Sequence, residues 1–187
     1  GNDHGSIACV NGQWYIFYHR HTNKTCFSRQ GCAEKITILP DGTIPQVEMT
    51  SCGLNDGPLA PAGSYPAPIA CNLTNDHLPD KIDRETPIAY ITCDRGERII
   101  KDISDSFRVG YKYFAFDGPV TLGVVVRGKA RGILEIATED GIIGRLDIAP
   151  SENWKTLTAP IAVSGTKGLY LTYHGDGAFD MKEFFFA

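Results

Sequence analysis

Long apolar runs are absent from this sequence of 187 residues. No run approaches the roughly 18 consecutive apolar residues that cross a bilayer, so we expect no membrane partner. An excess of positive charge is also absent, because 18 lysines and arginines stand against 22 acidic residues, for a net charge of −4. A nucleic-acid-binding face needs clustered basic side chains. We therefore expect no nucleic-acid partner either.

Closely paired cysteines are missing as well. The six cysteines lie in the first half of the chain, and none forms a C-x-x-C pair. The spacing typical of a zinc site or a thioredoxin-like motif is therefore absent. We expect several of the cysteines to be small buried hydrophobic side chains, while a Cys26–Cys32 disulfide stays open for an oxidising compartment. The sequence leaves the localisation open between cytoplasmic and secreted.

Helical periodicity is the fourth absence, and strand patterns take its place. Residues 7–20 indicate a hairpin around Asn11-Gly12, and residues 35–50 indicate a second around Asp41-Gly42, because these dipeptides tolerate the positive φ of tight turns. The strand QWYIFYHR is aromatic on both faces, so both faces need cover. Four short strands covered on both sides are typical of one β-propeller blade. Such a blade requires further blades or another copy of the chain as its partner.

The second half of the chain has a different organisation. Short apolar segments separated by glycine-containing turns occur at 88–93, 111–116, 120–127, 132–138, 142–148, 161–163, 169–173 and 181–186. Strands at this spacing are typical of an all-β sandwich. We predict an all-β protein with one propeller blade within 1–73, a polar linker at 74–87 and a jelly-roll β-sandwich at 88–187.

Polar residues near the predicted blade are the first candidates for a binding site. His4 lies in the loop before the first strand, where it either faces a ligand or metal ion or caps the loop. His19 and His21 share a strand face and could chelate a metal together, although a satisfied surface pair is the simpler interpretation. Arg29 lies between the two hairpins, and its fixed guanidinium fork suits vicinal oxygens of a polar ligand.

Aromatic side chains in the second half are the candidates for stacking on a sugar. Tyr111 begins a predicted strand, and Trp154 lies in the polar stretch SENWK, where it is either a platform or a plug over the core. The acidic residues give no matching signal for hydrolysis, which needs two carboxylates across a cleft. Four acidic residues occupy ordinary strand positions, and none of them stands out as a catalytic candidate: Glu34, Glu48, Glu135 and Asp147.

The chain resembles a known family in two consecutive parts. The stretches NDHGS, GQWYIFYHR, FSRQGCAEKITILPDGTIPQVEMTSCGLN and YPAPIACNL resemble the last propeller blade of glycoside hydrolase family 43. These enzymes are five-bladed propellers, mostly α-L-arabinofuranosidases and β-xylosidases. The remainder, from VGYKYFAFDGPVTLGVVVRG through GRLDIAPSENWKTL to GLYLTYHGDGAFDMKEFFF, is similar to the family 6-like carbohydrate-binding β-sandwich that often follows such propellers. Together the two resemblances cover nearly the whole chain, in the family's order.

The resemblance implies roles for four residues. His4 matches a histidine near the propeller axis, close to the sugar or to a bound calcium ion, and Arg29 matches an arginine of the active-site pocket. Tyr111 and Trp154 fall where such sandwiches place their stacking aromatics. No residue here matches the family's three catalytic carboxylates, and the stretch FDMKEF at 179–184 departs from the asparagine and tryptophan often found there.

Two functions remain as alternatives. The first is the C-terminal part of a glycoside hydrolase acting on arabinose- or xylose-containing oligosaccharides or polysaccharides, inactive by itself. The second is a non-catalytic carbohydrate-binding sandwich with an attached blade. Calcium is the one cofactor that the resemblance leaves open.

Overall fold

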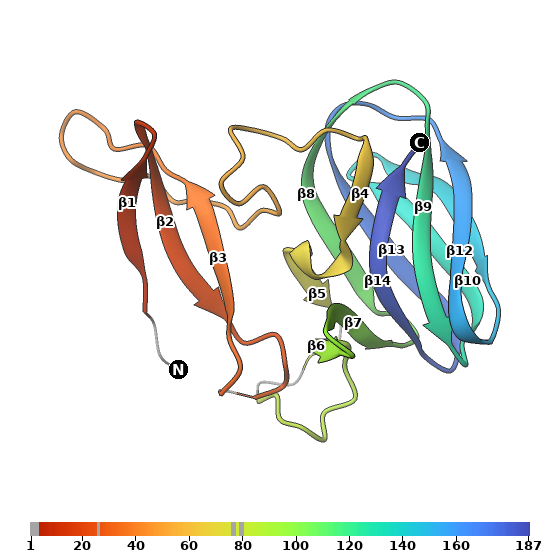
Figure 1. The fold of residues 1–187 in the computed structure, drawn as a ribbon. Helices are drawn as coiled ribbons and strands as arrows, with labels where there is room; N and C mark the ends of the chain where they lie inside the picture. Colours follow the sequence, from red (N-terminus) through yellow and green to blue (C-terminus); the bar gives the residue numbers. More distant parts are fainter. Residues whose placement is uncertain (1–3, 26, 76–77, 79–80) are drawn as a thin grey trace.

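The computed structural model describes residues 4–25, 27–75, 78 and 81–187. Its strands form a three-stranded sheet at one side and two facing sheets at the other (Figure 1). The predicted all-β class is confirmed. None of the helices in these ranges is long and apolar enough to cross a membrane.

The three-stranded sheet contains β1 (Ser6–Val10), β2 (Gln13–Arg20) and β3 (Gln30–Lys35) in that order. Asn11 and Gly12 form the predicted turn between β1 and β2, with φ of 50° and 82°. Both values lie in the left-handed region that the tight hairpin requires. The first predicted hairpin is therefore confirmed.

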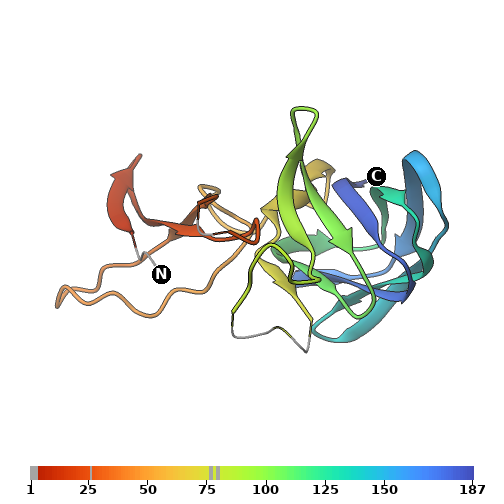
Figure 2. The same cartoon turned by 90° about the horizontal axis from the view of Figure 1, so that it is seen from below.

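The second predicted hairpin does not form a pair of strands. Residues 36–47, which we call the arm, contain no strand and extend away from the sandwich (Figure 2). Asp41-Gly42 still turns the chain, because the amide of Leu39 donates to the carbonyl of Thr43. The prediction of two strands here, and with it a four-stranded blade, is wrong for this chain, since a two-stranded ribbon without a neighbour is only marginally stable.

Two antiparallel sheets form the sandwich. The five-stranded sheet has the order β11 (Gly141–Ile148), β10 (Arg131–Thr138), β13 (Ser164–Asp176), β8 (Arg108–Asp117) and β5 (Asn72–Thr74). The six-stranded sheet has the order β12 (Ser151–Ile161), β9 (Val120–Gly128), β14 (Phe179–Phe186), β7 (Glu97–Ile103) and β6 (Tyr90–Asp94), and β4 (Gly63–Pro66) also pairs with β14.

The core lies between these two sheets. Tyr111 and Phe114 from β8 meet Phe184 and Phe186 from β14, with the ring centres of Tyr111 and Phe184 4.3 Å apart. Each of these four side chains is buried. In the described part of the chain before residue 51, by contrast, only Tyr15 and Ile36 are buried hydrophobic residues. The three-stranded sheet thus has little core of its own.

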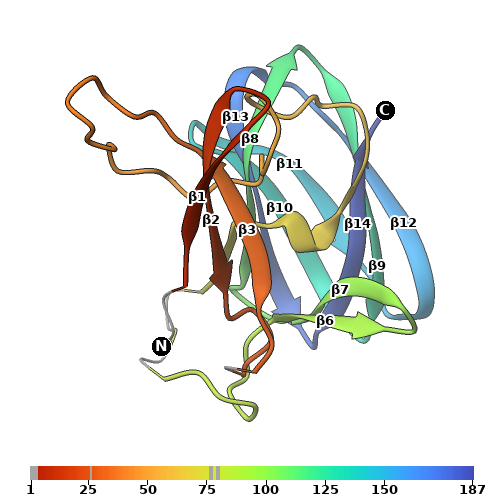
Figure 3. The same ribbon diagram turned by 60° about the vertical axis from the view of Figure 1, so that its left-hand side comes forward.

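The segment between the two parts belongs to the sandwich by its pairing. β4 pairs with β14, and β5 pairs with β8. Between them the short 3₁₀ helix η1 (Ala67–Ile69) lies between β3 and the six-stranded sheet (Figure 3). The domain limits 1–73, 74–87 and 88–187 stay a prediction, but the sandwich sheets include residues that precede the expected linker.

Candidate functional site

Three histidines gather at one end of the three-stranded sheet. His4 precedes β1, His19 lies near the end of β2, and His21 follows it. The ring centres of His4 and His19 are 6.0 Å apart, and those of His19 and His21 are 5.5 Å apart. His4 and His21 are exposed. The structure therefore places these imidazoles side by side on the surface.

Arg29 lies at the same end of the sheet. It precedes β3, whose first residue, Gln30, pairs with Arg20, the last residue of β2. Since antiparallel neighbours bring the end of one strand beside the start of the next, Arg29 comes near the histidine end of β2. Arg29 is exposed. We call His4, His19, His21 and Arg29 the polar end of the sheet.

The polar end does not by itself make a metal centre. Within the described residues, no group of three or more His, Cys, Asp or Glu side chains is arranged to hold a metal ion. The role of His4 toward calcium stays a prediction. For the Cys26–Cys32 disulfide that the sequence left open, the structure gives Cys32 a free thiol. Cys26 lies outside the described residues.

Two residues that the sequence analysis did not single out connect this end to the sandwich. Nη1 of Arg20 donates to the carbonyl of Ala70 at 2.9 Å, and Nε2 of Gln30 donates to the carbonyl of Pro68 at 2.8 Å. Their proximity to the histidines and to Arg29 was visible in the sequence. Their partners were not, because η1 is more than 35 residues away along the chain.

Trp154 lies on strand β12 and not in the polar loop that the sequence suggested. Its ring is covered by cations: Cζ of Arg127 lies 4.4 Å from the ring centre and Nζ of Lys182 lies 5.5 Å from it. Asp94 and Asp180 hold Arg127 at 2.5 and 3.2 Å. The hydrogen bond from this guanidinium keeps the pKa of Asp94 below its usual value. A sugar would have to compete with Arg127 for this ring.

Tyr111 is placed where no ligand reaches it. Its side chain has 0% exposure, its hydroxyl donates to the carbonyl of Ala67 at 3.1 Å, and burial raises its pKa well above the ordinary value. A ring without exposed surface cannot stack on a sugar, so the expected platform is instead part of the core. Alternation places Tyr111 on the same side of the strand as Val109, which is also buried, a signal that its aromatic character outweighed in the sequence analysis.

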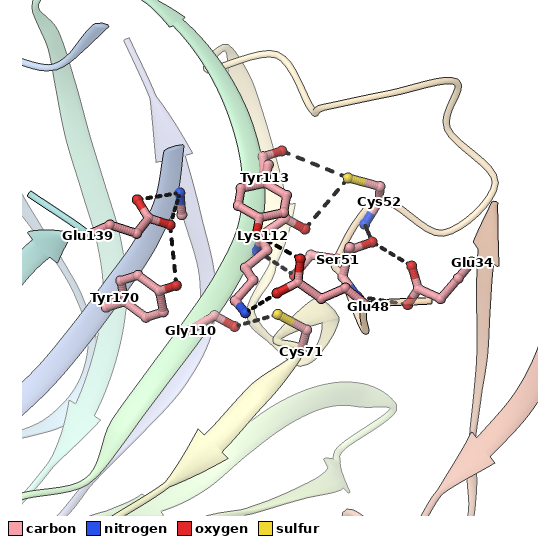
Figure 4. A network of polar contacts seen from close by, with 12 residues as sticks. Glu34, Glu48, Ser51, Cys52, Cys71, Gly110, Lys112, Tyr113, Glu139 and Tyr170 are labelled. Atoms are coloured by element: carbon pink, nitrogen blue, oxygen red, sulfur yellow. Dashed lines mark hydrogen bonds and ion pairs between the residues drawn. The ribbon is translucent and has the colours of Figure 1, made fainter. Parts of the chain in front are cut away.

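A strap of residues 48–59 crosses from the three-stranded sheet to the sandwich (Figure 4). Glu48 accepts a hydrogen bond from Nζ of Lys112 at 2.6 Å and one from the hydroxyl of Tyr113 at 2.7 Å. The bond to Glu48 raises the pKa of Tyr113 to about 12. The bond from Lys112 lowers the pKa of Glu48. This carboxylate is thus committed to a contact within the protein.

Glu34 is committed in the same way. It is 5% exposed and accepts hydrogen bonds from the amide and hydroxyl of Thr50 at 2.8 and 2.6 Å. The Tyr18 hydroxyl donates a third at 3.0 Å, and burial together with this carboxylate raises the pKa of Tyr18. Glu34 and Glu48 therefore act as anchors of the strap and not as a hydrolytic pair.

A groove of about 520 Å³ is lined by residues of β3, β4, η1, β7 and β14. Its lining includes Gln30 and Pro68 together with Glu97, Arg98 and Lys182. Lys182 is also one of the two cations beside the ring of Trp154.

A curated relative is similar to nearly the whole chain. The chain is 44% identical, over 98% of its length, to a protein from Thermoclostridium stercorarium named xylosidase/arabinosidase. The chain spans 42% of the length of that relative. No protein-family model matches the chain.

Solved structures share the fold at low sequence identity. A family 43 arabinoxylan arabinofuranohydrolase from Bacillus subtilis, solved with cellotetraose, matches 100% of this chain and 41% of its own length, with a TM-score of 0.64 and 15% identity. A family 6 carbohydrate-binding module from Clostridium cellulolyticum, solved with xylose, matches 69% of this chain and 99% of its own length, with a TM-score of 0.57 and 16% identity. A β-1,3-glucan-binding family 6 module from Bacillus halodurans matches 70% of this chain and 98% of its own length, with a TM-score of 0.56 and 20% identity.

These similarities confirm the resemblance stated from the sequence. The relative covers both parts of the chain at high identity. The arabinofuranohydrolase contains both parts together, and the isolated binding modules match a share of the chain that corresponds to the sandwich.

Proposed function

We propose that this protein is the C-terminal part of a family 43 glycoside hydrolase. The chain resembles part of such an enzyme over nearly all of its own length. The parent enzyme hydrolyses arabinose- or xylose-containing oligosaccharides or polysaccharides, as an α-L-arabinofuranosidase or β-xylosidase. The observation that carries the proposal is the 44% identity over 98% of the chain to a xylosidase/arabinosidase.

The structure supports a division of labour in which this chain binds and does not cleave. Glycoside hydrolysis uses a pair of carboxylates flanking the bond, and the most buried candidate here, Glu34, is fully engaged by Tyr18 and Thr50. The catalytic carboxylates are therefore supplied by sequence beyond this chain. His4 and Arg29 contact the sugar from the polar end of the sheet.

A non-catalytic carbohydrate-binding role of the sandwich is the second candidate. The likeness of the sandwich to family 6 modules and the partly exposed ring of Trp154 favour it. The burial of Tyr111 and the guanidinium of Arg127 over Trp154 count against a strong site. The two roles are compatible within one enzyme.

The test measures hydrolysis of 4-nitrophenyl α-L-arabinofuranoside and β-D-xyloside by the natural full-length protein and by this chain alone. We expect turnover by the full-length protein and none by the chain. His4→Ala and Arg29→Ala should each lower kcat/KM about tenfold or more, the effect of losing a hydrogen bond or charge contact to substrate. Arg145→Ala is the matched control, because Arg145 is an exposed arginine that pairs with Glu135 on the sandwich. Absence of pentoside hydrolysis by the full-length protein would refute the proposal.

A further inference from the structure

We infer that the sandwich positions the polar end of the three-stranded sheet, and that Arg20 and Gln30 are the positioning residues. The inference rests on the proposed function, because it assigns the sandwich a task in sugar binding at a surface that the sandwich does not itself form. It rests on the order of residues along the chain, in which Arg20 lies between His19 and His21, and Gln30 follows Arg29.

Arg20 and Gln30 form one directly paired position of the sheet. They lie opposite each other at the last rung between β2 and β3, and each donates to a main-chain carbonyl of the segment that contains η1. The Gln30 side chain also accepts a hydrogen bond from the Thr22 hydroxyl at 3.2 Å. Both ends of its amide are therefore fixed, and the rung is attached to the sandwich through both strands.

The histidines project away from these attachments. Successive side chains of a strand point to opposite faces, so His19 faces away from Arg20. His21 follows on the side of His19, since their rings are 5.5 Å apart, and His4 stands next to His19 on the same side. A bond that holds Arg20 thus sets the orientation of His19 and His21 without touching a ligand.

The carbonyls that receive these bonds belong to a rigid support. Ala67 and Ala70 are 0% and 1% exposed, and the buried Tyr111 donates its hydroxyl to Ala67. The amide of Cys71 donates to the carbonyl of Gly110 on β8 at 3.0 Å. The segment is therefore bonded directly to a central part of the core.

A third attachment lies on the loop that leaves β2. The amide of Ile91 on β6 donates to the carbonyl of Thr22 at 2.7 Å. With Arg20 and Gln30, this bond ties the sheet to the sandwich at three points next to His21 and Arg29. Binding groups keep a productive geometry when neighbouring hydrogen bonds fix their orientation, which is the role we assign to these contacts.

The first measurement uses this chain and requires no substrate. Backbone amides of residues 17–21 should exchange with deuterium about tenfold faster in Arg20→Met and in Gln30→Met than in the parent chain, because the attachments that suppress local opening are lost. Arg145→Met and Gln46→Met are matched controls at exposed positions away from η1 and should leave exchange unchanged. Unchanged exchange in both test variants would overturn the inference.

The second measurement uses the full-length enzyme. Arg20→Met and Gln30→Met should raise KM for the aryl pentoside about tenfold and leave kcat within about threefold, because the polar end binds the sugar and the carboxylates lie elsewhere. Arg20→Lys should restore part of the loss, since an ammonium still reaches one carbonyl. Lower stability alone would reduce the amount of active enzyme, and thus apparent kcat, without raising KM.

The outcomes separate the two proposals. A KM equal to that of the control variants overturns the positioning role even if the enzyme is an active pentosidase. An inactive full-length protein refutes the proposed function, and the exchange measurement then decides the positioning inference by itself.

Discussion

The two aromatic residues expected to stack on sugar have opposite surroundings. Tyr111 lies inside the sandwich and bonds to Ala67, whereas Trp154 lies at the surface beneath Arg127. A sugar-binding platform needs an accessible face, so only Trp154 retains that role as a proposal. The difference follows from the side of the strand on which each ring lies, which their residue type does not show.

Tyr111→Phe should destabilise the chain by about 1 kcal/mol, because it removes one hydrogen bond to the Ala67 carbonyl, which keeps its bond from the amide of Ala70. Urea unfolding at neutral pH measures the change. Tyr170→Phe is the matched control, since the Tyr170 hydroxyl makes one long contact of 3.4 Å with Glu139 at an exposed position. Equal stability of the two variants would show that the bond from Tyr111 is not needed.

The sandwich should bind xylohexaose no more tightly than millimolar. One ring that buries about 60 Å² of a sugar contributes roughly 1.5 kcal/mol, while a millimolar Kd requires about 4 kcal/mol. Displacement of Arg127 from the ring further reduces the gain. Titration calorimetry on the chain measures this affinity. A micromolar Kd that is lost in Trp154→Ala, but kept in Trp14→Ala on the three-stranded sheet, would contradict the prediction.

At the level of elements, the sequence predicted strands best where pairing is local. The hairpin at Asn11-Gly12 and the strands β8 to β11 lie close to their expected positions. The strand β7 (Glu97–Ile103) was missed because its charged residues obscure the apolar alternation. The strand β12 was read mostly as a loop because of its polar residues and Pro160, which an edge strand tolerates.

Contacts between distant segments could not be predicted from the sequence. The sequence predicted the residues of the polar end as separate binding candidates, and the structure places its histidines together. The bonds of Arg20 and Gln30 depend on the path of residues 63–73, which the sequence analysis assigned to the blade. The prolines and glycines of this segment predict irregular backbone, but they do not show which sheet the segment joins.

The strap predicts a pH dependence through Glu48. Its pKa is lowered from the ordinary value of 4.5, chiefly by the bond from Lys112. The stabilisation is therefore complete above that value and is lost as the pH falls through the lower folded-state pKa. Glu48→Gln should lower the free energy of unfolding by about 0.5 kcal/mol at pH 7, because the pair is exposed. In this variant the free energy of unfolding should fall less steeply below pH 4.5. Urea unfolding from pH 7 to pH 3 measures it, and an equally steep acid loss in the variant would contradict the prediction.

The start of an independently folding sandwich is a further prediction. A fragment of residues 58–187 should unfold cooperatively, whereas a fragment of residues 88–187 should be less stable and prone to aggregate. The shorter fragment lacks β4 and β5, which cover the edges of β14 and β8, and uncovered edges pair with other chains. Circular dichroism melting and light scattering compare the two. Equal stability would place the limit at residue 88, as the sequence analysis expected.

At the scale of the whole molecule, the two parts differ in how completely each buries its own apolar side chains. The sandwich has a core of buried aromatic and aliphatic side chains from both sheets. The three-stranded sheet depends on the sandwich through Arg20, Gln30 and the strap. Its opposite side, at β1, ends in an edge strand. The molecule thus has a complete core on the sandwich side and an unpaired edge strand, β1, on the other.

This open side predicts self-association of the chain when it is produced alone. Ile7 and Trp14 are 47% and 40% exposed on β1 and β2, and exposed apolar edge strands promote pairing between chains. Sedimentation velocity should show dimers or larger species that increase with concentration. Ile7→Lys should shift the chain toward monomer, because a charge on an edge strand opposes pairing. Ile142→Lys is the matched control, at a residue 49% exposed on the edge strand β11. Dissociation by Ile142→Lys and not by Ile7→Lys would show that the sandwich, and not the open sheet, forms the contact.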